Sequence, residues 1–262
     1  MVVYYTFYQR IKLKKFLFID LDDTLFQTIG KCVQGDDLHP AAYLKDGSAC
    51  SFMTKRQLAF FELMRGEMTL IPATARNRDA LSRVDLPFTS YSIINYGGVI
   101  LEPGGMVDNT WLEIMRGDME SAQDGLKSLI QIIDEYSDRK GLKGRARLIE
   151  DFSIPFYIVV KDPNKIIENL ELLERDIVLP WINTVGQKYF IHRNGNNLAV
   201  LPKTLNKARA VAYLRKQLES EYGDIMTIGM GDSRSDARFM SECDYAIIPS
   251  GTQLASQIMA LV

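Results

Sequence analysis

The sequence predicts an α/β protein: a doubly wound, Rossmann-like parallel sheet with a smaller α/β domain inserted into it. Three observations predict this class. Short apolar runs recur along the chain with helical patterns between them, which is typical of parallel strands buried on both faces. Acidic, hydroxyl or basic side chains follow several of these runs, where an open α/β sheet places its ligand crevice. A separate alternation of helices and strands interrupts the series over residues 113–195.

The composition excludes several classes of function. Hydrophobic residues make up 47% of the 262 residues and charged residues 24%, which is an ordinary globular balance. A net charge of −2 gives no electrostatic basis for binding nucleic acid. No apolar run approaches the roughly 20 residues of a membrane helix, so we expect no membrane partner. The oligomeric state is left open. The three cysteines form no CxxC pair, which predicts reduced thiols and a cytoplasmic location.

The first strand leads into the most informative stretch of the chain. Residues 1–8 are apolar and are expected to form an extra edge strand or an ordered arm. The run Phe16–Ile19 predicts a buried strand, and the acids that follow it, Asp20 and Asp22, must lie at its carboxyl end. Because Asp20 and Asp22 are two residues apart, their side chains would point the same way in extended backbone. A cation that prefers oxygen ligands, such as Mg²⁺, would relieve the repulsion between the two carboxylates. The alternative is an ordinary solvated turn.

A second strand end repeats this logic. The stretch 30–51 is expected to be a long loop or hairpin over the site, followed by a helix over 55–65 that ends at Gly66. The next strand, from Met68, ends in Thr74 and Arg76, and a helix follows. A threonine at a strand-to-helix junction suits phosphate binding, because the helix presents free N–H groups to anions. The alternative is a helix N-cap without a ligand.

The inserted region has its own pattern. Residues 91–94 predict a third strand, followed by a glycine-containing turn. Beyond it we expect helices over 115–136 and 163–175 and strands over 156–160 and 188–192. In the last of these strands Lys188, Phe190 and His192 share one face, while Arg193 belongs to the other. We expect His192 and Arg193 to contact a substrate. The alternative is an ordinary half-solvated strand.

The chain is expected to return to the core after residue 195. The run 198–202 predicts a core strand, and Lys207 follows near the start of a helix, where lysines are usually solvated. The run 225–229 predicts a further strand that ends in Asp232 and Asp236. Asp232 can reach the cation that the first two acids need, and Asp236 can contact it or orient its waters.

Four stretches in this order resemble the motifs of the haloacid dehalogenase (HAD) superfamily: Asp20-Leu21-Asp22-Asp23-Thr24, Thr74-Ala75-Arg76, Asn206-Lys207-Ala208 and Gly231-Asp232-Ser233-Arg234-Ser235-Asp236. The resemblance implies that Asp20 is a nucleophile and Asp22 a general acid/base. It implies a phosphate site formed by Thr74, Arg76 and Lys207. It also implies Mg²⁺ ligands at Asp20, Asp22 (through its backbone carbonyl), Asp232 and Asp236. Ala75 stands where the family commonly has glycine, and serines stand at 233 and 235 where it often has asparagine.

The insert, which lies between the second and third motifs, is similar to the α/β cap of one HAD branch. That branch includes sugar-phosphate phosphatases, sucrose-phosphate phosphatase, mannosyl-phosphoglycerate phosphatase and phosphomannomutase. The resemblance implies a core of residues 1–112 and 196–262 with a cap of residues 113–195. It implies Mg²⁺-dependent hydrolysis of a small phosphorylated metabolite through an aspartyl-phosphate. A phosphomutase, and a HAD-like domain that only binds or assembles, remain alternatives.

Overall fold

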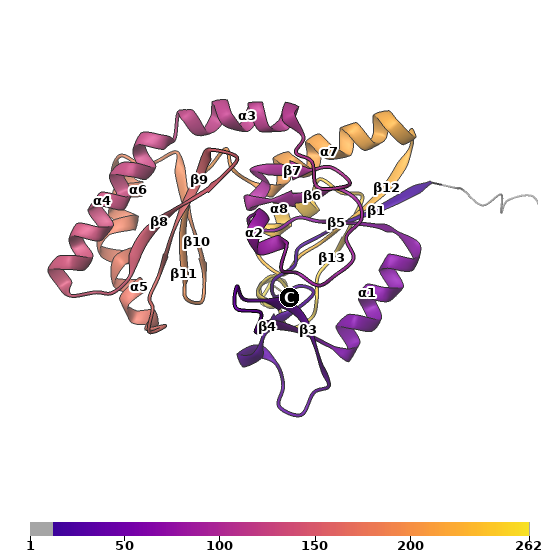
Figure 1. Ribbon diagram of the computed structural model, residues 1–262, viewed down its shortest axis with the longest axis horizontal. Coiled ribbons are helices and arrows are strands. Elements are labelled where there is room, and N and C mark those ends of the chain that lie inside the picture. Colours follow the sequence, from indigo (N-terminus) through magenta and orange to yellow (C-terminus); the bar gives the residue numbers. More distant parts are fainter. Residues whose placement is uncertain (1–12, 262) are drawn as a thin grey trace, which may run out of the picture. The chain divides into compact units, whose positions relative to one another are not determined.

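The computed structural model describes residues 13–261 and divides the chain into two compact units (Figure 1). One unit comprises Met1–Met106 and Lys207–Val262, and the other comprises Val107–Asn206. The edge strand or arm expected over residues 1–8 lies outside the described residues. Between residues 13 and 261, no helix combines the length and apolarity needed to cross a membrane.

The first unit contains the parallel sheet that the sequence predicts. The strand order is β13-β12-β1-β5, with β1 paired on both sides in parallel. Leu17 and Ile19 of β1 pack in a core cluster with Phe61 of helix α1 (Lys55–Glu67), whereas Phe16 contacts Tyr222 of helix α7 (Lys207–Tyr222) on the opposite face. Helices therefore cover both faces of this sheet. Its strands are β1 Lys14–Ile19, β5 Thr69–Pro72, β12 Ile225–Met230 and β13 Tyr245–Ile247.

The helices of the first unit follow its strands. Thr54 caps α1 through a reciprocal pair of hydrogen bonds with Gln57. The prediction that Gly66 ends this helix is wrong: α1 continues past Gly66, and its C-cap is Met68, whose N–H donates to the Met64 carbonyl. The helices are α1 Lys55–Glu67, α2 Arg78–Leu81, α7 Lys207–Tyr222, α8 Asp236–Met240 and α9 Gln253–Met259.

A small antiparallel sheet occupies the stretch expected as a long loop or hairpin. Its order is β2-β4-β3, and a 3₁₀ turn, Ile29–Lys31, follows β2. Ala41, Ala42 and Met53 of this sheet are buried in the same core cluster as Leu21 and Phe26. The sheet is therefore anchored beside the end of β1. Its strands are β2 Gln27–Thr28, β3 Leu38–Tyr43 and β4 Ala49–Thr54.

A second hairpin, β6 Ser92–Ile94 with β7 Val99–Leu101, adjoins the end of β5 through a parallel bridge between Ala73 and Ile93. Its turn has Asn95, Tyr96 and Gly97 at φ 52°, 57° and 97°. The N–H of Asn95 donates to the Arg76 carbonyl, and that of Tyr96 to the Thr74 carbonyl. The left-handed turn thus fixes the backbone of the Thr74–Arg76 stretch.

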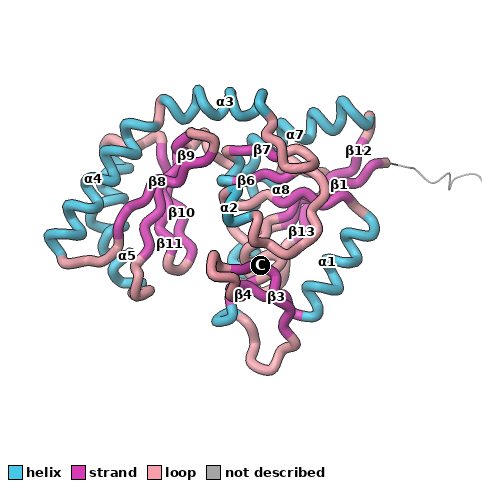
Figure 2. The backbone as a smooth tube through the Cα atoms, viewed as in Figure 1, coloured by secondary structure: helices cyan, strands magenta, loops and turns pink. Residues whose placement is uncertain are grey.

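The second unit is an antiparallel sheet of order β10-β11-β9-β8, with α4, α5 and α6 against one face (Figures 1 and 2). Its core joins Leu126 and Ile133 of α4 to Ile158 of β9 and Val200 of β11, all fully buried. The strands are β8 Arg145–Asp151, β9 Ile154–Lys161, β10 Tyr189–Asn194 and β11 Asn197–Pro202. The helices are α3 Asn109–Glu120, α4 Gln123–Lys140, α5 Ile167–Leu173, a π-helical turn Glu174–Val178 and α6 Leu179–Thr184.

Several predicted elements of this unit differ from the observed ones. The run 198–202 is not a core strand: it is β11, which pairs with β10 on one side and β9 on the other. The second unit consequently extends over Val107–Asn206 rather than 113–195. The helix predicted over 115–136 is broken at Ser121–Ala122, and the helix predicted from Pro163 begins only at Ile167.

Candidate active site

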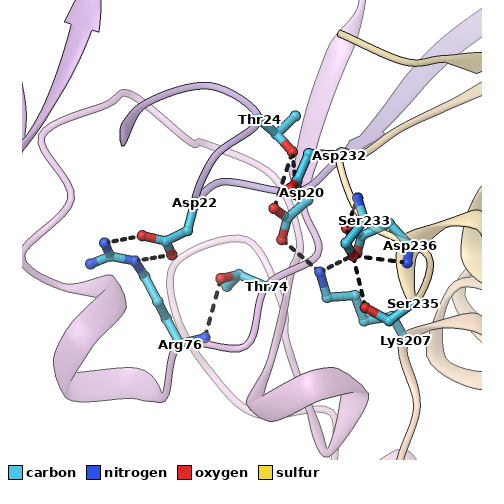
Figure 3. Close-up of polar contacts among 10 residues, drawn as sticks. All are labelled: Asp20, Asp22, Thr24, Thr74, Arg76, Lys207, Asp232, Ser233, Ser235 and Asp236. Carbon is cyan, nitrogen blue, oxygen red and sulfur yellow. Dashed lines mark hydrogen bonds and ion pairs between the residues drawn. The ribbon is translucent and has the colours of Figure 1, made fainter. Parts of the chain in front are cut away.

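The carboxyl ends of β1 and β12 bring two sequence-distant aspartates together. Asp20 directly follows β1, and its backbone N–H donates to the Met230 carbonyl at 2.9 Å. Because β12 is the parallel neighbour of β1, Asp232 arrives at the same edge. One oxygen from each of Asp20, Asp232 and Asp236 lies within 4.8 Å of the others. Three of the acids expected at strand ends therefore lie together (Figure 3).

Lys207 joins this acidic cluster. It is the first residue of α7, and its Nζ lies 2.6 Å from Asp20 Oδ1 and 2.7 Å from Asp236 Oδ1. Its side chain is only 8% exposed. A lysine near the start of a helix is usually solvated, but the ammonium of Lys207 is buried and held by two carboxylates. It therefore offsets much of the negative charge of the cluster.

Asp236 is held in place from two sides. One oxygen accepts from Lys207, and the other accepts from the hydroxyl of Ser233 at 2.5 Å and from the Ser233 N–H at 3.2 Å. A Cβ on Gly231 would lie 2.4 Å from the Asp236 Cβ, so only glycine fits there. Because both Asp236 oxygens have donors, its contacts favour orienting Lys207 over binding a cation directly. The contact of Ser233 was not foreseen from the sequence.

Thr24 is a second residue that sequence reasoning left out of the site. Its hydroxyl lies 3.1 Å from Asp20 Oδ2 and 3.2 Å from Asp232 Oδ1, so it can donate to either carboxylate. Thr24 is 2% exposed. The signal that could have found it was present, because Thr24 is the threonine of the Asp-x-Asp-x-Thr motif itself.

Burial dominates the electrostatics of the cluster. Burial raises the pKa of Asp20 well above its ordinary value, and the charge of Lys207 opposes this only in part. Burial and the neighbouring Asp236 carboxylate raise the pKa of Asp232 to about 6. Burial opposes ionisation of Asp236 too, but the charge of Lys207 holds its pKa below the ordinary value. Burial alone would lower the pKa of Lys207, but Asp20 and Asp236 raise it.

Asp22 faces a different partner. Arg76 donates from Nε to Asp22 Oδ2 at 2.8 Å and from Nη2 to Asp22 Oδ1 at 2.7 Å. The prediction that the carboxylates of Asp20 and Asp22 are held together is therefore wrong. β1 ends at Ile19, before both acids, so the alternation of a strand does not set their relative direction. Asp22 is absent from the converging acids found among residues 13–261.

Thr74 and Arg76 lie together, as predicted, after β5. Thr74 is fully buried, and its hydroxyl accepts from the Arg76 N–H at 3.1 Å. The guanidinium of Arg76, predicted as a phosphate ligand, instead has protein partners at each of its three nitrogens: Asp22 at two and the Ala80 carbonyl at the third. These contacts favour a role in holding Asp22.

His192 and Arg193 lie on β10 of the second unit, while the acids and Lys207 lie in the first. Arg193 donates to Glu174 at 2.7 Å and to the Gly195 carbonyl at 3.2 Å. Ile191, two residues before Arg193, packs against the helix-side core. By strand alternation His192 occupies the opposite face. The contacts of Arg193 therefore favour a structural role.

The converging donors suit a hard cation. Carboxylate oxygens are the ligands that Mg²⁺ prefers in proteins. Lys207 occupies one oxygen each of Asp20 and Asp236. The single hydroxyl of Thr24 reaches both Asp20 Oδ2 and Asp232 Oδ1 but can donate to only one of them, so these oxygens are the best suited to a cation. The residues present fit such an ion, with Asp20 and Asp232 as its side-chain ligands.

Comparison with known proteins identifies the family. The family model described as sucrose-6F-phosphate phosphohydrolase matches residues 13–256, nearly the whole chain. The chain belongs to this family. The predicted membership of the HAD superfamily is thereby confirmed, and with it the α/β fold class. The sucrose-6F-phosphate phosphohydrolase family consists, by its description, of hydrolases of phosphoric monoesters.

The individual proteins that this family member resembles have low sequence identity to it. A glucosyl-3-phosphoglycerate/mannosyl-3-phosphoglycerate phosphatase of Persephonella marina is 28% identical over 124 residues, which are 47% of this chain and 40% of that protein. The sucrose-phosphatase of Synechocystis sp., solved with sucrose and phosphate, has a TM-score of 0.51 at 16% identity, covering 95% of this chain and 97% of that one. The C-terminal domain of trehalose-6-phosphate phosphatase from C. albicans has a TM-score of 0.55 at 14% identity, covering 88% and 74%.

Proposed function

We propose that this protein is a Mg²⁺-dependent phosphatase that hydrolyses a small phosphorylated metabolite, a sugar phosphate, through an aspartyl-phosphate on Asp20. One observation carries the proposal. Asp20 is 6% exposed, yet one of its oxygens is held by Lys207 and the other by Thr24. Burying a carboxylate beside a second acid costs free energy, and a role as the nucleophile accounts for a carboxylate that is nevertheless buried there and oriented at both oxygens.

In the first step an oxygen of Asp20 attacks phosphorus and the ester P–O bond breaks. Asp22 enters this step protonated, on a lone pair that the two bonds from Arg76 leave free, and gives that proton to the departing alcohol, while the phosphoryl group is left on Asp20. In the second step a water attacks phosphorus, Asp22 takes the proton of that water, and the acyl-phosphate bond breaks. Inorganic phosphate and the Asp20 carboxylate result, so both protons and both bonds are accounted for.

The phosphoryl oxygens carry negative charge into a cluster that is already acidic. Lys207 supplies a fixed positive charge beside the nucleophile, and the Thr74 hydroxyl supplies a donor at the neighbouring strand end. Mg²⁺, held by Asp20 and Asp232, would add positive charge for the phosphoryl oxygens. Asp236 keeps Lys207 in position for the nucleophile.

Carbohydrate is the substrate class that the comparisons favour. The names of the relatives reported above each combine a sugar with a phosphate ester. The second unit stands in the chain between the segments that carry Thr74 and Lys207, as the cap does in the branch that the sequence resembles. We propose that it is the cap that selects the alcohol part of the substrate.

The test is a phosphate-release screen of the purified protein against phosphorylated sugars and an aryl phosphate, with Mg²⁺ and with a chelator. We expect release from the aryl phosphate and from at least one sugar phosphate, and its loss on exhaustive chelation. Asp20→Asn is the matched control, because it keeps the size of the side chain and removes the nucleophile. Release by Asp20→Asn at the wild-type rate would refute the assignment of Asp20, and release that survives chelation would refute the metal requirement.

A further inference from the structure

The pair formed by Asp22 and Arg76 stands apart from the acidic cluster. Figure 3 shows the Asp22 carboxylate directed at the Arg76 guanidinium, while the Asp20 carboxylate is directed at Lys207. Two parallel N–H···O bonds of 2.8 and 2.7 Å form a bidentate fork, which fixes the direction of a carboxylate as well as attracting it. Asp22 is half-exposed, so without Arg76 its side chain would be free to rotate.

Arg76 is itself immobilised. Its side chain is 14% exposed, its guanidinium lies 5.2 Å from the centre of the Phe26 ring, and Nη1 donates to the Ala80 carbonyl at 3.3 Å. The backbone N–H of Arg76 donates to the Thr74 hydroxyl, and its carbonyl accepts from Asn95. The direction of Asp22 is thus set by a residue fixed to the strand end that carries Thr74.

We propose that Arg76 is a positioning residue that orients Asp22 for proton transfer, rather than a ligand of the substrate phosphate. This inference rests on the proposed function, in which Asp22 is the acid/base. The fork ties the end of β1 to the end of β5, so that the proton donor and the Thr74 hydroxyl keep a fixed relation. A lysine could supply the charge but not the fork.

The kinetic test separates the two roles of Arg76 by leaving group. The phenolate of an aryl phosphate departs without a proton, whereas the alkoxide of an alkyl or sugar phosphate needs one. Because acid–base catalysis contributes about 10²–10⁴-fold, we expect Arg76→Met to lower the single-turnover rate of Asp20 phosphorylation about 10²-fold with the alkyl ester and less than about threefold with the aryl ester. Hydrolysis of the phosphoenzyme, in which Asp22 takes the proton of water, should slow equally after either ester. A phosphate ligand would instead cost both esters alike and raise KM for both. Arg76→Lys should rescue only part of the loss.

A double-mutant cycle shows whether Arg76 acts through Asp22. If it does, Arg76→Met in the Asp22→Asn background should cost less than about threefold further on the alkyl ester, because the positioned group is already gone. Independent, additive losses would overturn the proposal. Arg83→Met is the matched control: Arg83 makes comparable bonds to the Tyr43 and Asp79 carbonyls nearby, and its loss should leave the ratio of alkyl to aryl rates unchanged.

A crystal structure of Arg76→Met decides the positioning claim without turnover. We expect the Asp22 carboxylate to rotate or lose order, while Asp20, Lys207 and Asp236 stay in place. An Asp22 carboxylate unmoved in this variant would overturn the proposal. If the wild-type protein releases phosphate from no ester, the proposed function fails, and the crystal structure still tests whether Arg76 positions Asp22.

Discussion

Replacing Lys207 by methionine removes the only cation that contacts the buried acids in the described part of the chain. Methionine keeps the length and most of the apolar contact of the stem, including the neighbourhood of Phe239, whose ring centre lies 5.4 Å from Nζ. What is lost is the ammonium between Asp20 and Asp236. Removing one partner of a buried ion pair costs about 3–5 kcal/mol, because the other charge stays buried without compensation.

We therefore expect the free energy of unfolding of the first unit to fall by about 3–5 kcal/mol in the metal-free protein near neutral pH. The loss should shrink on acidification, because protonated carboxylates no longer need the lysine. Added Mg²⁺ should restore part of the stability, since it supplies positive charge to the same oxygens. Lys216→Met, at an exposed position of the same helix, should change stability by less than about 0.5 kcal/mol.

Urea denaturation offers an internal reference. Both tryptophans, Trp111 and Trp181, lie in the second unit, so their fluorescence follows that unit, whereas far-ultraviolet circular dichroism follows both units. Lys207→Met should lower the circular-dichroism midpoint more than the fluorescence midpoint. A metal-free variant within about 1 kcal/mol of wild type near pH 7.5 would refute the idea that this lysine compensates buried charge.

Three further outcomes follow from the site. The pKa of Asp232 is raised to about 6, so protonation of Asp232 stabilises the fold; this contribution is complete below the ordinary pKa of 3.8 and is lost as the pH rises through about 6. Mg²⁺ should therefore raise Tm more at pH 7.5 than at pH 5, and equal shifts in Tm would contradict Asp232 as a ligand. His192→Ala should change the relative rates among sugar phosphates and spare an aryl phosphate; a uniform change would contradict a substrate contact. Arg193→Met should destabilise the second unit by about 1–3 kcal/mol through loss of its bonds to Glu174, as followed by tryptophan fluorescence, with substrate preference unchanged.

The strand ends of the site could be predicted because the cause is local. An apolar run followed by acids fixes Asp20 and Asp232 at the carboxyl ends of strands, and parallel pairing then brings them together. The direction of Asp22 could not be predicted, since it depends on Arg76, 54 residues away, and because Asp22 lies beyond the end of β1. Alternation in extended backbone holds only as far as the strand continues.

The local sequence pattern also could not predict to which sheet a strand belongs. The residues of β11, Asn197–Pro202, form an apolar run that is typical of a strand in a parallel core sheet. Burial on both faces explains the run, but burial occurs equally in the centre of the antiparallel sheet, where β11 lies between β10 and β9. β8 was missed for the opposite reason, because Arg145–Asp151 is largely polar and partly exposed.

The discontinuity of the first unit also sets an order of events during synthesis. Phe16 of β1 pairs with Thr227 of β12, so the central strand of the first unit waits for a partner some two hundred residues away in the chain. At about 5–20 residues per second, Asp232 leaves the ribosome about 10–40 s after Asp20. The second unit, continuous in sequence and with its own apolar core, is complete before then. The nascent chain therefore carries a finished inserted domain beside an apolar strand with one side unpaired, and the acidic cluster forms last.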